Sequence, residues 1–281
     1  MAVVELTSDP GGLFLKAALG MVPSRRPDAL PDREIVRRGV AVDLGHLARY
    51  DRVCGFRLTD TLPATYPHVL AFPLAMTLMA AADFPFPVVG IVHVANRISV
   101  RRPLLAAEKI DLLVRAENLR SHDRGRVFDV VATAFASGEN VWTGVSTYLS
   151  KNATSSVGHA PRDHPPTPAP TAVWTVPARV GSDYAAVSGD HNPIHTSRIG
   201  ARLFGFPRPI AHGMWSKARA LAALEGRLPA EYTVDVAFKQ PILLPARVGF
   251  SASPRSSSHT DGWEFRLDSQ RPHLAGLVTP P

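Results

Sequence analysis

Hydrophobic and polar positions along the chain fall into the same order twice. Each half contains one helical segment rich in apolar residues, near residues 73–82 in the first half and residues 214–225 in the second. Each segment is followed by four β-rich runs of alternating or fully apolar character. These eight runs lie near residues 88–102, 107–119, 126–137, 141–149, 232–240, 246–254, 262–268 and 273–278. The pattern predicts one buried helix and four strands in each half.

Matching landmarks indicate that the two halves are copies of one unit. Tyr50 and Tyr184 open similar segments 134 residues apart, and Ala71 and Ala211 open the two helical segments 140 residues apart. Six additional residues therefore separate the landmarks in the second half. A lone helix followed by strands favours an antiparallel sheet covered on one face by that helix, an α+β layer. We predict two such layers.

A proline-rich stretch marks the boundary between the units. Residues 151–171 hold five prolines after position 160, a density that is typical of an extended linker. We therefore predict an N-terminal unit over residues 1–150, a linker over 151–171 and a C-terminal unit over 172–281. An apolar run at residues 11–22 is interrupted by Lys16 and lacks preceding positive charge, so we predict a short amphipathic helix and neither a signal peptide nor a membrane span.

Composition and charge indicate the compartment and the classes of binding partner to expect. A single cysteine, Cys54, excludes an internal disulfide and fits a reducing, cytoplasmic compartment. The net charge of +7 comes mainly from arginine, since only five of the 31 basic residues are lysines. The basic doublets are scattered and no nucleic-acid motif accompanies them, which disfavours nucleic-acid binding. Arginine matches phosphate and carboxylate geometry, so the phosphates of a small ligand or an acidic carrier protein are better partners.

Residues 188–195, which read S-G-D-H-N-P-I-H, hold the candidate chemistry. Proline biases the residue before it away from the helical region, so this segment is a turn that can bring Asp190 and His195 together. Asn192 can hold the loop through an Asx-type bond. A carboxylate beside an imidazole forms an acid/base pair that can bind one water. Asp190, His191 and His195 could also ligate a metal, but no fourth ligand at zinc-like spacing accompanies them.

A second motif follows the turn. Residues 211–214 read A-H-G-M and begin the second helical segment. Free N–H groups at a helix start can receive an oxyanion, so we assign carbonyl polarisation to the amides of Gly213 and Met214. His212 fits either a capping or core role or a direct catalytic one. No nucleophile elbow and no glycine-rich phosphate loop occurs, which disfavours covalent catalysis.

With these motifs the chain resembles the MaoC-like, type 2 (R-specific) enoyl-CoA hydratase family of hot-dog proteins, and in particular the double hot-dog (R)-3-hydroxyacyl-thioester dehydratases of mycobacteria. The resemblance implies two antiparallel sheets, each wrapped around a central helix. It implies reversible hydration of trans-2-enoyl thioesters in fatty-acid metabolism without metal or redox cofactor. Asp190 and His195 would hold the catalytic water, Asn192 would orient the loop, and the Gly213 amide would polarise the thioester carbonyl. Ser188 and Gly189 match the family's approach to the turn.

The first half departs from the family pattern. Residues 55–61 read G-F-R-L-T-D-T where the second half has the catalytic turn, and residues 71–74 read A-F-P-L in place of A-H-G-M. This half is therefore predicted to be catalytically silent. In the family a degenerate half supplies a wall for the acyl tail, for which the candidates are Phe72, Met76, Leu78 and Met79. Residues at this spacing also fit an ordinary core.

Two other functions stay open. A thioesterase is one, because hot-dog folds also host hydrolysis, although such enzymes do not generally show the Asp-x-Asn-Pro-x-His turn. A non-catalytic acyl-binding protein or partner subunit is the other, although this chain carries an intact motif beside its degenerate half. The expected substrate is an acyl-CoA or acyl-carrier-protein thioester, with medium or long acyl chains favoured. A homodimer is compatible with these features.

Overall fold

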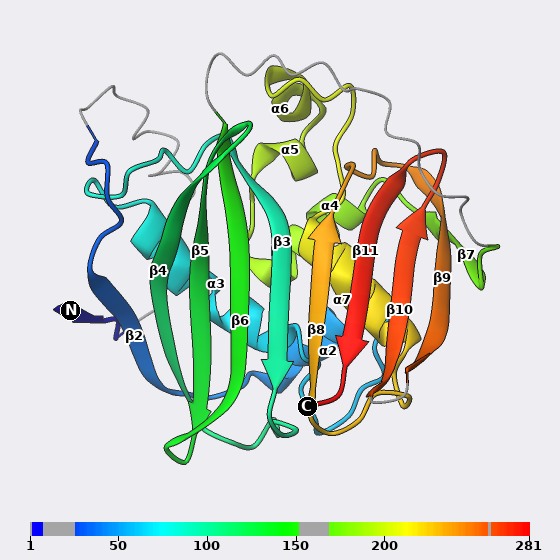
Figure 1. The fold of residues 1–281 in the computed structure, drawn as a ribbon, viewed down its shortest axis with the longest axis horizontal. Coiled ribbons are helices and arrows are strands. Elements are labelled where there is room, and N and C mark those ends of the chain that lie inside the picture. Colours follow the sequence, from blue (N-terminus) through cyan, green and yellow to red (C-terminus); the bar gives the residue numbers. More distant parts are fainter. Residues whose placement is uncertain (1, 8–25, 152–168, 258–259) are drawn as a thin grey trace.

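The computed structural model describes residues 2–7, 26–151, 169–257 and 260–281 (Figure 1). The predicted helix over residues 11–22 and most of the predicted linker lie outside the described residues. In chain order the elements are β1 (Ala2–Glu5), β2 (Arg33–Val40), α2 (Leu44–Cys54), α3 (Tyr66–Met79), β3 (Ile91–Val100), β4 (Ile110–His122), β5 (Gly125–Ala136), β6 (Glu139–Lys151), β7 (Ala172–Val176), α4 (Val180–Ser188), α5 (Pro193–Thr196), α6 (Arg198–Leu203), α7 (Gly213–Ala223), β8 (Tyr232–Phe238), β9 (Ala246–Ser257), β10 (Thr260–Asp268) and β11 (Pro272–Thr279).

The strands form one continuous sheet of 11 strands in the order β1-β2-β4-β5-β6-β3-β8-β11-β10-β9-β7 (Figure 1). β1 pairs with β2 in parallel, and the other pairings are antiparallel. The predicted α+β double hot-dog architecture is confirmed. The two sheets are not separate, however, because their edge strands β3 and β8 pair, with Val100 opposite Tyr232. The order of strands on either side of this seam is the same apart from β1, so the halves are related by an approximate twofold.

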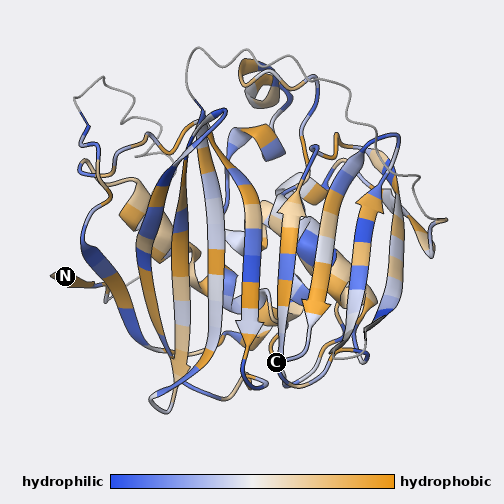
Figure 2. Cartoon of the chain, viewed as in Figure 1, coloured by the Kyte–Doolittle hydropathy of each residue, from blue (hydrophilic) through white to orange (hydrophobic). Residues whose placement is uncertain are grey.

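The helices lie on one face of the sheet, where α3 packs against β2, β4 and β5 and α7 packs against β10. Hydrophobic and hydrophilic residues alternate along many of the strands (Figure 2). This period-2 pattern turns one set of side chains toward the helices and the other toward solvent. On β5 even the second set is largely apolar, and Phe128, Val130 and Val131 are all nearly inaccessible.

All eight predicted runs correspond to strands. The sequence analysis missed β1, β2 and β7. β2 contains three arginines among its eight residues, which obscures its alternation, and β7 is only five residues long. The predicted first helical segment also begins too late, since α3 starts at Tyr66.

A buried lysine ties the two halves together at the seam. Lys217 of α7 is fully buried, and its Nζ donates to the carbonyl oxygens of Asn96 and Val234, both at 3.1 Å, and to Asn96 Oδ1 at 2.6 Å. Asn96 lies on β3 and Val234 on β8, so the three bonds span the seam. Three acceptors match the three N–H donors of an ammonium group, although burial lowers the pKa of Lys217. The lysine therefore fixes α7 against both sheets.

Candidate active site

The predicted catalytic turn, residues 188–195, begins where α4 ends. Gly189 follows the helix with φ of +74°, a left-handed conformation that glycine adopts without strain. A Cβ at this position would also lie 3.8 Å from the ring of Phe72. The hydroxyl of Ser188 accepts a hydrogen bond from the Asp190 amide at 3.2 Å. These contacts set the direction in which the chain leaves α4.

Side-chain to backbone bonds then close the turn. Asp190 Oδ1 accepts from the Asn192 amide at 3.2 Å, and Asn192 Oδ1 accepts from the Ile194 amide at 3.2 Å. Asn192 is thereby the N-cap of α5, and Pro193 takes the first helical position, where no donor is lost. The short helix α5 places His195 on the inner side of the turn.

His195 is buried and held in one orientation. Its Nδ1–H donates to the carbonyl oxygen of Ile210 at 2.8 Å, and the Ile210 amide donates in return to the carbonyl of Ile194 at 3.1 Å. Because a carbonyl can only accept, the neutral imidazole carries its proton on Nδ1 and leaves Nε2 as an acceptor. Burial lowers the pKa of His195, against the opposing effect of the Asp190 charge. The neutral, accepting form therefore prevails at neutral pH.

His212 supports Asp190, the other member of the predicted acid/base pair. Its Nε2–H donates to the backbone carbonyl of Asp190 at 3.0 Å, whereas the carboxylate Oδ2 lies 3.7 Å away. The ring stacks on His195 with centroids 3.6 Å apart and also contacts Tyr184. Burial and the neighbouring His195 hold the pKa of His212 well below its usual range. The ring is thus neutral and positions the Asp190 backbone.

The three side chains converge. Side-chain N or O atoms of Asp190, His195 and His212 all lie within 4.8 Å of one another. A water that bonds two partners at about 2.8 Å each can join groups at this separation. The Asp190 side chain is 25% exposed, while His212 is 3% exposed. The carboxylate therefore meets solvent at the edge of a buried imidazole pair, an arrangement suited to proton transfer with a bound water.

The same trio is the group among the described residues that could hold a metal ion. To bind one metal ion, the two imidazoles would have to direct their in-plane lone pairs at the same point, where the ion would lie. The rings of His195 and His212 stack with an interplanar angle of 24°, so their lone pairs lie side by side. His191, which the sequence analysis considered as a ligand, is exposed and not part of the trio. The geometry suits acid/base chemistry better than ligation.

The predicted oxyanion amides lie at the start of α7. Gly213 is the first residue of this helix and His212 precedes it as the N-cap, so the amides of Gly213 and Met214 belong to the first turn, which has no intrahelical acceptors. A Cβ on residue 213 would lie 3.1 Å from the ring of Phe238 on β8. Glycine therefore allows this ring to approach the helix start closely.

In the first half, the structure corrects the predicted alignment. Residues 71–74 do not begin a helix, because Phe72 and Pro73 lie inside α3. The helix begins at Tyr66, with Pro67 in its first turn. The ring contact between Tyr50 and Tyr66, with centroids 5.2 Å apart, parallels the contact of Tyr184 with His212 at 4.9 Å. Tyr66 thus stands where His212 does, and Pro67 removes an amide N–H from that helix start.

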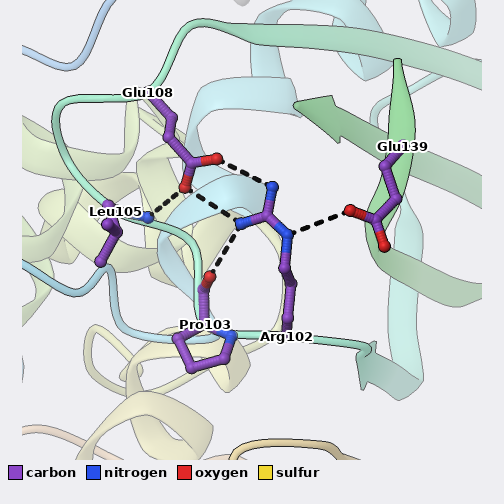
Figure 3. A network of polar contacts seen from close by, with 5 residues as sticks. All are labelled: Arg102, Pro103, Leu105, Glu108 and Glu139. Atoms are coloured by element: carbon purple, nitrogen blue, oxygen red, sulfur yellow. Dashed lines mark hydrogen bonds and ion pairs between the residues drawn. The ribbon is translucent and has the colours of Figure 1, made fainter. Parts of the chain in front are cut away.

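A pocket of about 310 Å³ occupies the corresponding place in the first half. Phe56 and Thr61 line it, and they follow Gly55 as Asp190 and His195 follow Gly189. Other apolar walls come from both halves: Leu62, Pro67, Leu104, Trp142, Leu221 and Leu228. Arg102 lies at this pocket with its guanidinium bonded to Glu108 and Glu139 (Figure 3). The pocket has neither a carboxylate nor an imidazole at the equivalent positions.

The predicted acyl-tail residues separate into two groups. Met76, Leu78 and Met79 are almost inaccessible and belong to the hydrophobic core. Phe72 is only partly buried, and its position beside Gly189 brings it to the edge of the catalytic turn. Of these residues, Phe72 alone lies beside the predicted catalytic turn.

Two contributors had no signal in the sequence. The carbonyl of Ile210 fixes His195 through its backbone, which any residue type could provide. Half-buried His93 and Tyr148 stack at 4.6 Å on neighbouring strands, and His93 also contacts Phe238 at 5.0 Å. Alternation along β3 would place His93 on the same face as exposed Arg97, but the register shift between His93 and Ala95 turns it toward His68 of α3. Its partners depend on strand pairing.

No helix in the described part of the chain is long and apolar enough to cross a membrane.

Comparisons with known proteins show the family and the fold of the chain. The family described as MaoC like domain matches residues 160–259. The 3-hydroxyacyl-thioester dehydratase X of Mycobacterium tuberculosis is 39% identical over 281 residues, which cover 96% of this chain and 99% of that protein. A crystal structure of HtdX from Mycobacterium tuberculosis is similar with a TM-score of 0.78 and 36% identity, covering 89% of this chain and 100% of that one. A double hot-dog protein of the same organism, 12% identical with a TM-score of 0.52 over 86% of this chain and 92% of its own, shares the fold.

Proposed function

The chain belongs to the family of MaoC-like dehydratases, and on this premise we propose that it interconverts trans-2-enoyl thioesters and (3R)-hydroxyacyl thioesters by syn addition and loss of water. Enzymes of this family are hydro-lyases, and the relative from Mycobacterium tuberculosis is named for dehydration of 3-hydroxyacyl thioesters. We assign the present chain to the same chemistry, in fatty-acid metabolism.

One observation supports the proposal most directly. The bond from His195 Nδ1–H to the Ile210 carbonyl leaves Nε2 free to accept a proton, and the Asp190 carboxylate lies within 4.8 Å of the imidazole. A water between these groups can donate to both. Its oxygen is then activated for attack on C3 of the enoyl group.

The substrate carbonyl would lie at the start of α7. Attack at C3 moves charge onto the thioester oxygen, where an enolate develops. First-turn amides of Gly213 and Met214 can donate to that oxygen, and their stabilisation grows as the charge develops. Lys217 fixes the same helix against β3 and β8, so these donors are held in place before the substrate binds.

Two proton transfers complete the reaction. His195 takes a proton from the water while the water oxygen bonds to C3, and the resulting imidazolium lies beside the negative Asp190. The pair returns this proton to C2, which restores the thioester carbonyl. Hydroxyl and proton come from one side of the substrate, so the addition is syn. Dehydration follows the same steps in reverse.

The test is the loss of enoyl-thioester absorbance when the purified protein meets trans-2-enoyl-CoA of four, eight and twelve carbons. Asp190→Asn and His195→Gln should each lower kcat by about 10²-fold or more, since one general acid/base group contributes 10²–10⁴-fold. His191→Gln is a matched control because this exposed histidine lies in the same turn outside the trio. Product that is not (3R), or full activity in both catalytic variants, would refute the proposal.

The same assay separates the alternatives. A thioesterase would release free CoA thiol, which a thiol reagent detects. An acyl-thioesterase structure is similar to this chain with a TM-score of 0.52 and 11% identity, and this likeness extends to the fold alone. A non-catalytic partner subunit would be inactive until a second polypeptide was added. We expect the chain to be active by itself, with one competent site.

A further inference from the structure

Helix α6 carries an unusual surface directly beside the catalytic turn. Among the described residues ten large hydrophobic side chains are well exposed, and three of these lie within residues 199–204. Ile199 is 73% exposed, Leu203 79% and Phe204 41%. Ile199 and Leu203 are four residues apart in the helix, so they lie on one face. Clustered exposed apolar residues of this kind mark interaction sites.

The same surface is basic. Arg198 and Arg202 are exposed and also four residues apart, and Arg208 follows the helix. No ion pair of Arg198 or Arg202 occurs among the described residues. The sequence contains no aspartate or glutamate between Asp190 and Glu225. This segment therefore presents positive charge without compensating acids of its own.

Close packing fixes α6 relative to the catalytic residues. A Cβ on Gly200 would lie 2.5 Å from the Pro193 Cβ and 2.7 Å from its carbonyl oxygen, so only glycine allows this approach. The Ser197 hydroxyl accepts from the Gly200 amide at 3.2 Å and caps the helix. The other face of α6 is thus anchored on α5, the helix that carries His195. A molecule bound to the exposed face would have a defined position relative to the active site (Figure 1).

We propose that the α6 surface, formed by Arg198, Ile199, Arg202, Leu203, Phe204 and Arg208, docks an acidic acyl-carrier protein that delivers the acyl group on its phosphopantetheine arm. This inference rests on the proposed function, since it names the carrier of the same thioester. Acidic side chains of the carrier pair with the arginines, and apolar side chains of the carrier cover Ile199 and Leu203.

Charge and hydrophobicity together favour this occupant. The phosphates of CoA would engage the arginines but would leave the apolar face of Ile199 and Leu203 uncovered. A second copy of this chain in an isologous contact would bring the same basic surface against itself. An acidic protein with an apolar patch complements both features, and electrostatic attraction accelerates its encounter with the enzyme.

The experiment compares one trans-2-octenoyl group on three carriers: a purified bacterial acyl-carrier protein, CoA and N-acetylcysteamine, which has no phosphate. The charge variant is Arg198→Glu with Arg202→Glu, and the apolar variant is Leu203→Ser. Matched controls lie on α2, a helix well separated from α6 (Figure 1). They are Arg49→Glu with Arg52→Glu, and Leu44→Ser, where Leu44 is 64% exposed.

With the carrier-protein substrate, kcat/KM should fall about 10-fold or more in the charge variant, and the salt dependence seen in the unmodified chain should weaken. In the apolar variant kcat/KM should fall several-fold, as for truncation of an interface side chain. Turnover of the N-acetylcysteamine thioester should be unchanged in both variants, and the controls should match the unmodified chain.

Three results would overturn the docking surface. The first is that the charge variant lowers turnover of the CoA and carrier-protein substrates equally while Leu203→Ser affects neither, which would make the arginines a nucleotide-phosphate site. The second is that neither variant changes turnover of any of the three thioesters. The third is that the surface binds anionic lipid vesicles while the variants leave carrier-protein kinetics unchanged. If the unmodified chain turns over none of the three thioesters, the proposed function fails instead, and the two failures remain distinguishable.

Discussion

Substitution of Gly181 tests how tightly His195, the proposed catalytic histidine, is positioned. Gly181 lies in α4, and a Cβ there would be 2.0 Å from the His195 carbonyl oxygen. Ordinary contact begins near 3.4 Å, so in Gly181→Ala the backbones of residue 181 and His195 must separate by about 1.4 Å. A misplacement of about 1 Å can lower the rate by 10²-fold. We expect a comparable loss of kcat.

Stability should change much less than activity. Alanine is favoured over glycine in a helix by about 1 kcal/mol, which partly offsets the 1–3 kcal/mol typical of overpacking a core. Hydration of trans-2-octenoyl-CoA gives kcat, and urea unfolding gives the free energy of unfolding. Gly45→Ala is the control, because its Cβ would approach only side-chain atoms, those of Asp43 at 3.2 Å and of Arg49 at 3.6 Å. A folded Gly181→Ala enzyme with kcat within twofold of the unmodified chain would refute the reasoning.

Three further predictions concern protonation and packing. Burial lowers the pKa of His195 below the ordinary histidine value of 6.5, and the proposed base must be neutral. In a pH profile, kcat/KM should therefore fall only below pH 6.5. Loss of kcat/KM that already begins above pH 6.5 on acidification would contradict this. Lys217→Met leaves three buried acceptors without their donor and should lower the free energy of unfolding by about 2–4 kcal/mol in urea, unlike Lys239→Met at an exposed site. Trp142→Phe loses the 2.7 Å bond from Nε1 to the Ala64 carbonyl and should cost about 1 kcal/mol in addition to lost packing, measured by thermal unfolding.

Much of the fold could be predicted from the sequence, because each of the eight predicted runs carries its own alternating or fully apolar pattern. The pairing of β3 with β8 could not, since it joins residues such as Val100 and Tyr232 that no local pattern relates. The start of α3 was also misplaced. The predicted segment begins near Pro73, whereas the helix has Pro67 in its first turn and accommodates Pro73 in its interior. Proline position alone does not distinguish the two.

At the site, the sequence indicated which side chains form the turn and could not indicate what holds them. Asp190, Asn192 and His195 lie within six residues, so a turn brings them together through local bonds. The carbonyl of Ile210 and the ring of His212 come from a segment 15 or more residues further on. Their contribution depends on packing, which composition and spacing do not encode.

The continuous sheet has a consequence for how this protein can evolve. In a homodimer of identical units every substitution appears twice, once at each site, and a change that harms catalysis harms both. Here the two units share one chain but differ in sequence, and the β3–β8 seam keeps them in fixed one-to-one stoichiometry. The loop after Gly55 can therefore change independently of the turn after Gly189, which carries the residues of the proposed chemistry.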